Sequence, residues 1–383
     1  MKQNRFLRAT LAYGLATVAF TLLLVGRVLQ AKATKIEMTP EHWAFPPGKV
    51  EFVQYHGNDA MKISPGTSPV SLKEMVFTNG IIEFDVEPSQ PDFVSFYFRR
   101  QNTDEGELVY LRTWNAGKPT APDTLQYAPM VKSVNLWDLL GHFQAACDLR
   151  SNNWNHVKLV VSGAQLRVFV NDTAKPVLEV PQLEGDVTSG ELAFQGAAYF
   201  ANLRVIPGEV EGLSAAEGID PTSNDPRYLR RWKVSKPMEL PPGRELFRGE
   251  LPRPDAAWEP IDAERRGLVN ITRRFGKNEV RKAVWLKVNL RVAREQLRHL
   301  ELGFSDEVWV FLNGGLAFVD KNLYLQPLRK PPNGRCSLEN ATVNLTLKAG
   351  DNELLMGVAN DFYGWGIVAR FDDLDGVEVL GAK

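Results

Sequence analysis

The sequence predicts an all-β protein made of two antiparallel β-sandwiches in tandem, preceded by a hydrophobic helix for export or anchoring. Short alternating runs such as Gly80–Val86 and Gln165–Val170 recur along the chain, with Gly, Pro, Asn and Asp between them. At 383 residues the chain is longer than one typical domain. A polar, proline-containing segment at 207–226 divides the runs into two blocks.

The N-terminal segment, residues 1–33, has the features of a targeting sequence. Lys2, Arg5 and Arg8 precede the uncharged run 9–26, and the small-x-small tripeptide 31–33 follows. This order indicates a secretory signal cleaved after Ala33. The run is nearly long enough to span a bilayer, so an uncleaved anchor is the alternative. We therefore expect a secreted, periplasmic or cell-surface protein that contacts a membrane through this segment alone.

The composition excludes some classes of partner and scaffold. Lys plus Arg (45) and Asp plus Glu (46) give a formal net charge of -1, so nothing favours nucleic-acid binding. The two cysteines, Cys147 and Cys336, are too few for a disulfide scaffold. Two buried free thiols are favoured, with one interdomain bridge as the alternative.

The runs assign a range to each domain. Residues 38–206 form the first sandwich, with strands such as Phe93–Phe98 and Val157–Val161, and 207–226 form a linker. Residues 227–383 form the second sandwich, with strands such as Val284–Leu290 and Glu307–Leu312. Between these strands, 292–300 is expected to be a short helical turn or a polar loop.

Three motifs connect the first block with known families. They are F-x-N-G-x-x-x-F-D from Phe77, W-N-x-V-K from Trp154 and F-x-N-L-R-V from Phe200. In this order they resemble the laminin-G-like and concanavalin A-like lectin/glucanase sandwiches, and are similar to the bacterial 3-keto-disaccharide hydrolase family. The resemblance implies a fold and a carbohydrate partner, but no particular activity, because these positions are mainly core and turn residues.

The second block resembles the galactose-binding-domain-like jelly roll. The resemblance rests on Val284–Leu290, Ser305–Gly314 and Leu347–Leu355. It implies a jelly-roll module of the kind that accompanies glycosidases and surface lectins, often as an accessory. Near the C-terminus, Phe362–Trp365 is either an aromatic platform or a plug that closes the sandwich, and the plug is favoured.

Three acids, Glu83, Asp85 and Glu87, alternate along one predicted strand. A period of two places their carboxylates on one face. Retaining β-glucanases of the laminarinase type use this spacing for a nucleophile and an acid/base. Ordinary alternation on a half-buried strand gives the same array, and this second interpretation is favoured. If the protein is an enzyme, these acids and Glu107 are the catalytic candidates.

A better candidate for ligand binding lies further along the first block, where polar and aromatic residues follow one another on neighbouring strands and a long loop. Aromatic faces bind the C–H patches of sugars, while polar groups hold hydroxyls. The candidates are Tyr97, Arg99, Glu107, Tyr110, Arg112, Trp114, Gln126, Tyr127 and Trp137.

No catalytic cofactor is expected, and the one metal considered is a structural calcium. Asp306, Asp320 and Asn322 in the second block carry suitable oxygens, but their spacing matches no fixed calcium loop. Turn capping is the favoured role for each.

Two carbohydrate-related function classes fit these observations. The favoured one is a non-catalytic carbohydrate-binding protein, because no convincing catalytic constellation is present. The alternative is a glycan-degrading hydrolase of the 3-keto-disaccharide hydrolase or retaining β-glucanase type. An envelope protein that binds other proteins through its sandwiches is a third interpretation.

Overall fold

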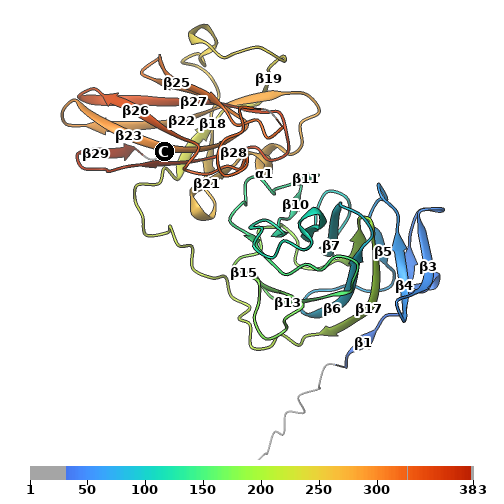
Figure 1. The fold of residues 1–383 in the computed structure, drawn as a ribbon. Helices are drawn as coiled ribbons and strands as arrows, with labels where there is room; N and C mark the ends of the chain where they lie inside the picture. The colour runs from blue at the N-terminus through green and yellow to red at the C-terminus, as the bar shows by residue number, and fades with distance from the viewer. Residues whose placement is uncertain (1–31, 326, 381–383) are drawn as a thin grey trace, which may run out of the picture.

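The computed structural model describes residues 32–325 and 327–380, and the all-β prediction is confirmed within them (Figure 1). The predicted signal or anchor falls almost entirely outside the described residues. Among those described, no helix is long and apolar enough to cross a membrane. Helical structure there consists of α1 (Ile271–Phe275) and 3₁₀ turns at Pro40–His42, Thr113–Asn115, Arg248–Glu250 and Arg265–Gly267.

The first domain is a sandwich of two antiparallel sheets. One sheet, called sheet A, has the order β15–β14–β13–β6–β17–β4–β3 with β1 beside β17, and the other, sheet B, has the order β12–β9–β8–β7–β16–β5–β2. Strands β10 and β11 form a separate hairpin. The strands are β1 (Thr34–Lys35), β2 (Trp43–Ala44), β3 (Val50–Tyr55), β4 (Asn58–Ile63), β5 (Val70–Leu72), β6 (Gly80–Pro88), β7 (Phe93–Arg100), β8 (Glu107–Arg112), β9 (Leu125–Tyr127), β10 (Met130–Val131), β11 (Val134–Asn135), β12 (Gln144–Ala145), β13 (Asn155–Ser162), β14 (Gln165–Val170), β15 (Leu178–Val180), β16 (Glu191–Gln195) and β17 (Ala198–Pro207).

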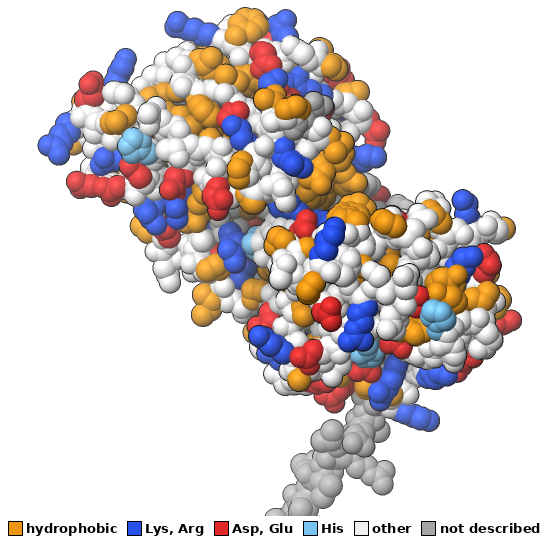
Figure 2. Space-filling model, viewed as in Figure 1, with side chains coloured by type: hydrophobic (Ala, Val, Ile, Leu, Met, Phe, Trp, Pro, Cys, Tyr) orange, Lys and Arg blue, Asp and Glu red, His pale blue; other side chains and the backbone are white. Residues whose placement is uncertain are grey.

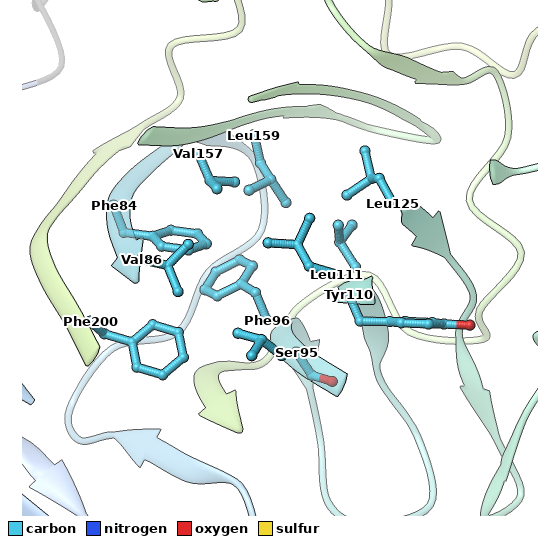
Figure 3. A pocket seen from close by; sticks show the side chains of 12 residues that line it. Phe84, Val86, Ser95, Phe96, Tyr110, Leu111, Leu125, Val157, Leu159 and Phe200 are labelled. Carbon is cyan, nitrogen blue, oxygen red and sulfur yellow. The ribbon is translucent and has the colours of Figure 1, made fainter. Parts of the chain in front are cut away.

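The core of the first domain lies between sheets A and B. Alternation along each strand directs one set of side chains inward, such as Phe84 on β6 and Phe96 on β7. Figure 3 shows these rings facing one another with Phe200 around a void of about 10 Å³, too small for a ligand. Tyr110 and Ser95 extend away from the apolar cluster (Figure 3), so sheet B presents a second, polar and aromatic face.

The second domain is a second sandwich. Its larger sheet has the order β20–β18–β22–β27–β24–β25, with β19 and β29 also pairing with β22, and its smaller sheet is β21–β28–β23–β26. The strands are β18 (Arg231–Val234), β19 (Met238–Glu239), β20 (Glu259–Asp262), β21 (Leu268–Asn270), β22 (Lys282–Val292), β23 (Gln296–Ser305), β24 (Glu307–Leu312), β25 (Gly315–Lys321), β26 (Ala341–Leu347), β27 (Gly350–Asn360), β28 (Gly366–Phe371) and β29 (Val377–Leu380).

One local prediction in this domain is correct only for residues 293–295, which lie between β22 and β23. The stretch 292–300 was expected to be a helical turn or polar loop, but β23 begins at Gln296 and pairs with β26 from there onward. The pairing buries Leu300 and Leu302 in the core of the second sandwich. A polar sequence can lie in a strand where its exposed face carries the polar residues.

The segment between the sandwiches packs along the first domain. Leu213 is buried against Ile81, Val160 and Phe169 on the outer face of sheet A. The Lys158 ammonium lies 2.5 Å from the Glu211 carboxylate. The predicted linker is therefore held against the first sandwich by apolar and ionic contacts.

The two sandwiches lie side by side and meet where the β10–β11 hairpin of the first domain approaches α1 of the second (Figure 1). Leu268 of β21 joins the hydrophobic core of the first domain, and Cys336 packs against that core. Cys336 and Cys147 are both free thiols. On the face shown in Figure 2, basic and acidic side chains are interspersed over both lobes, and apolar side chains gather near the junction.

Candidate binding cleft between the two sandwiches

A cleft of about 840 Å³ lies where sheet B of the first domain meets loops of the second. Aromatic rings from both domains dominate its lining. The first domain contributes Phe93, Tyr97, Tyr110, Trp114 and Trp137, and the second contributes Tyr324, Phe362 and Tyr363.

Strand alternation places the first-domain residues in the cleft. On β8, Val109 and Leu111 enter the core, so Tyr110 and Arg112 face the opposite side. The 3₁₀ turn Thr113–Asn115 follows β8 directly and holds Trp114 at the cleft, where 39% of the residue remains exposed. The Trp114 ring meets Phe93 edge to face, with centroids 4.7 Å apart.

A buried hydrogen-bond network fixes the cleft floor. The Tyr110 hydroxyl and an Arg112 guanidinium N–H both donate to Gln126 Oε1, at 2.7 Å and 2.6 Å. Gln126 Nε2 in turn donates to the Trp137 carbonyl at 2.8 Å. The Arg112 guanidinium also lies 5.1 Å from the Tyr110 ring centroid. Burial raises the pKa of Tyr110, so this phenol stays a neutral donor.

Trp137 connects this floor to the second domain. Its ring lies edge to face against Tyr324 at 4.7 Å and against Tyr363 at 6.1 Å. The buried Arg335 guanidinium lies 5.3 Å from the Trp137 centroid, and burial lowers the pKa of this arginine. Both Arg335 and Arg112 approach the Asp123 carboxylate, at 3.9 Å and 3.8 Å. The cleft is thus a composite of both domains.

Polar groups are distributed between the rings. They include Ser95, Asn135, Lys277, Asn278, Asn360 and Asp361. The buried Asn135 Oδ1 has no hydrogen-bond partner in the part of the chain that the structure describes. A buried acceptor without a partner is unfavourable, and this side chain must shift before a ligand hydroxyl can donate to it.

The predicted binding residues divide into three groups. Tyr97, Tyr110, Arg112, Trp114 and Trp137 line the cleft. Gln126 is fully buried beneath it and positions Tyr110 and Arg112 through the network described above. The remaining residues, Arg99, Glu107 and Tyr127, lie outside the cleft.

Arg99, Glu107 and Tyr127 have structural contacts of their own. The Arg99 Nε donates to the Thr78 carbonyl at 2.8 Å, away from the cleft. Glu107 lies on the core face of β8, where it accepts a hydrogen bond of 2.7 Å from the Tyr127 hydroxyl. Burial raises the pKa of Glu107 to about 7, although the Tyr127 hydrogen bond opposes this shift. We infer that this pair stabilises the sandwich interior.

The acidic array Glu83, Asp85 and Glu87 lies on the outer face of sheet A, the opposite sheet from the cleft. Each carboxylate has a partner there. Glu83 pairs with Arg204 at 3.4 Å, and Asp85 accepts from Asn202 at 2.7 Å and contacts His156 at 2.8 Å.

Glu87, the third acid of the array, is 3% exposed and accepts a hydrogen bond of 2.9 Å from the Tyr55 hydroxyl. It also contacts His56 Nδ1 at 3.1 Å. The array and Glu107 therefore share no cleft, whereas the catalytic alternative needs them in one.

The calcium candidates are engaged in hydrogen bonds and ion pairs. Asp306 Oδ2 accepts from the backbone N–H groups of Asp361 and Phe362, at 2.7 Å and 2.6 Å. Asp320 pairs with Lys330 at 2.5 Å, and Asn322 Oδ1 accepts from the Lys330 backbone at 2.9 Å. In the described residues no three His, Cys, Asp or Glu side chains converge on a metal position. This donor set does not fit a calcium ion.

Sequence reasoning missed the second-domain wall of the cleft. Tyr324, Lys277 and Asn278 carry no local signal, since only domain docking brings them to Trp137 and Tyr97. The Phe362–Trp365 cluster is divided between both expected roles. Trp365 is buried in the core of the second sandwich as a plug, whereas Phe362 and Tyr363 line the cleft.

A second cavity of about 640 Å³ also lies between the domains, but its charged lining is largely paired. Arg265 approaches Glu184 at 3.7 Å, and Arg370 approaches Glu301 at 2.5 Å. Burial, together with Arg266 and Arg265, lowers the pKa of His142 to about 3, so this imidazole stays neutral. Fewer aromatic rings make this cavity the weaker candidate for a sugar.

No protein-family model and no curated protein matches the chain. Among solved structures, a Bacillus subtilis carbohydrate-binding module, CBM66, is 13% identical with a TM-score of 0.33, covering 43% of this chain and 95% of that one. A Bacillus licheniformis β-glucanase is 11% identical with a TM-score of 0.30, and the match covers 45% of this chain and 91% of the glucanase.

Domain 4 of AbnA, an extracellular arabinanase of Geobacillus stearothermophilus, is 14% identical with a TM-score of 0.29, and the match covers 47% of this chain and 82% of that one. At these values the similarities assign no function. The fold and the site themselves define a two-domain β-sandwich protein with an aromatic cleft at the domain junction.

Proposed function

We propose that this protein binds carbohydrate in the cleft between its sandwiches and does not hydrolyse it. The observation that carries the proposal is the composition of the cleft, in which rings of both domains surround dispersed hydroxyl, amide and charged groups. Rings stack on the apolar faces of sugars, and the polar groups between them fix the hydroxyls.

The size of the cleft supports a ligand of more than one sugar ring. At about 840 Å³ it lies in the upper part of the usual range for small-molecule sites, roughly 300–1,000 Å³. Trp114, Phe93 and Tyr363 stay partly exposed at the cleft, with exposed fractions of 39%, 48% and 48%. Exposed rings of this kind provide stacking surfaces at low entropic cost, because each has only two side-chain torsions.

The acids argue for binding without hydrolysis. Glycosidases generally need two carboxyl groups that flank the scissile bond, about 5–5.5 Å or 6.5–9.5 Å apart. Asp361 is the only acid that lines the cleft in the described part of the chain. Glu107 and the Glu83–Glu87 array lie elsewhere, so none of them pairs with Asp361 across a bound sugar.

We place this activity outside the cytoplasm, on the strength of the N-terminal sequence alone. The basic start, the apolar run and the small-x-small tripeptide form an export signal or an anchor. Extracellular and envelope glycans would then be the accessible partners.

Saturation-transfer NMR of the purified protein with a panel of neutral and acidic oligosaccharides tests the proposal. We expect transfer to at least one sugar whose anomeric signals do not change over hours. New anomeric signals would establish hydrolysis and overturn the non-catalytic part. No transfer to any sugar would overturn the carbohydrate part and favour a protein partner.

A further inference from the structure

Two buried carboxyl groups meet at the interface between the domains. Asp138 follows Trp137 in the first domain, and Asp306 lies between β23 and β24 in the second. Each is 2% exposed. In the described residues neither carboxyl forms an ion pair with a lysine or arginine. Two unpaired carboxylates so close together, away from water, would repel strongly.

Ser305 bridges the two groups. Its Oγ lies 3.1 Å from Asp138 Oδ2 and 3.0 Å from Asp306 Oδ1. A hydroxyl carries one proton and can donate to only one of these oxygens. The second contact is a hydrogen bond only when the other carboxyl group is protonated and donates to Oγ. One proton shared by the pair would make both contacts full hydrogen bonds, as in other coupled carboxyl dyads.

The same two carboxyl groups hold one wall of the cleft. Asp306 accepts from the Asp361 and Phe362 amides, as described above, and Asp138 Oδ2 accepts from the Gly364 amide at 3.0 Å. Gly364 has no room for a side chain, since a Cβ there would lie 2.4 Å from Asp138 Oδ1. The loop that carries Phe362 and Tyr363 into the cleft is thus anchored on the pair.

Among the described residues, no ion pair brings a positive charge to either carboxyl group, although the Arg335 guanidinium lies 5.3 Å from the ring centroid of Trp137, the neighbour of Asp138. The Cys336 backbone N–H donates to the Asp138 carbonyl at 2.9 Å, and burial raises the pKa of its thiol. Tyr110 also faces Asp138, and its pKa is raised as well. Burial raises the pKa of Asp138 to about 7 and that of Asp306 well above its usual value, with the Asp138 charge adding to the second shift.

We propose that one proton, shared through Ser305 between Asp138 and Asp306, docks the two domains and holds the 361–364 loop in place. Loss of this proton at alkaline pH then loosens the cleft wall and lowers the affinity for ligand. The ligand half of this inference rests on the proposed function, whereas the docking half does not.

Hydrogen exchange of the ligand-free protein between pH 6 and pH 9 tests the docking half. Each rate is divided by the rate of an unstructured peptide at the same pH. Because deprotonation grows about tenfold per pH unit above the titration midpoint, protection of the 361–364 amides should fall at least about tenfold over this range.

The variant Asp306→Asn mimics the protonated state permanently. Its amide oxygen can accept from Asp361 and Phe362 while its NH₂ donates to Ser305, which then donates to Asp138. We expect its protection to be equal at both pH values. Asp85→Asn, on the outer face of sheet A, is the matched control and should keep the wild-type dependence.

Equal protection at pH 6 and pH 9 in the wild type would overturn the inference. So would a pH dependence in Asp306→Asn identical to that of the wild type. If Asp306→Asn fails to fold, the wild-type comparison between pH 6 and pH 9, with Asp85→Asn as control, still decides the docking half. A protein that binds no sugar but shows this pH response would refute the proposed function alone.

Discussion

The most direct test of the cleft is Trp114→Ala, because this ring lines the cleft and contributes little to packing of the hydrophobic core. About 39% of the residue is exposed. For a tryptophan of roughly 250 Å² this leaves on the order of 100 Å² for a ligand to cover. A sugar face that covers about half of it would gain about 1.2 kcal/mol at 25 cal/mol per Å².

The variant should therefore bind the glycan about eightfold more weakly, since 1.4 kcal/mol corresponds to a factor of about ten. Its free energy of unfolding should fall only by about 0.5–1.5 kcal/mol, the contribution of the edge-to-face contact with Phe93. Isothermal titration calorimetry gives the dissociation constant, and thermal unfolding gives the stability.

Phe247→Ala is the control for the loss of an exposed ring. Phe247 is 51% exposed and lies in the second domain, outside the cleft lining. Its removal should leave the dissociation constant unchanged. Unaltered glycan binding by Trp114→Ala, in a folded protein, would refute the placement of the ligand against this ring.

Three further predictions concern the buried Glu107, the acids on β6 and the calcium candidates of the second domain. The pKa of Glu107 rises from 4.5 to about 7, so its contribution to stability is fully present below pH 4.5 and is lost as the pH rises through 7. The free energy of unfolding of Glu107→Gln should therefore rise by up to about 3 kcal/mol relative to that of the wild type between pH 4.5 and pH 8, as measured by urea unfolding at each pH. A stability difference that stays constant with pH would contradict the raised pKa of Glu107. The double change Glu83→Gln and Asp85→Asn removes partly exposed pairs and should cost at most about 1 kcal/mol per pair and leave glycan binding intact. Lost turnover of a glycan in that variant would instead establish the hydrolase alternative. Chelation with EDTA should shift neither the melting temperature nor the dissociation constant, because the Asp306, Asp320 and Asn322 side chains are engaged within the protein; a lower melting temperature would reveal a metal that stabilises the fold.

Strand positions were the most predictable part of this protein. The runs Gln165–Val170 and Glu307–Leu312 coincide with β14 and β24, because alternating apolar residues bounded by turn residues favour a half-buried strand. Gly80–Val86 falls within β6, which extends to Pro88. The loop prediction for 292–300 failed from Gln296 onward because strand pairing, a long-range contact, overrode the polar composition there.

The candidate site was only half predictable. The aromatic and polar run from Tyr97 to Trp137 identified the first-domain wall of the cleft, because strand alternation is local and visible in sequence. The same run led us to include Glu107 and Tyr127 wrongly among the cleft residues. Alternation shows that a strand has two faces but not which of them packs against the core. Glu107 lies on the core face, where its partner is the Tyr127 hydroxyl.

The sequence by itself determined the all-β class, the two blocks of strands and the acids that alternate on β6. Only the tertiary structure decided that the β6 array and the β8 residues lie on opposite sheets, and that Tyr324, Phe362 and Tyr363 complete the cleft. It also brought Asp138 into contact with Ser305, the neighbour of Asp306, although 167 positions of sequence separate Asp138 from Ser305. The physical reason is that periodicity reports only which face a side chain takes along its own strand, whereas sheet pairing and domain docking depend on contacts between distant segments.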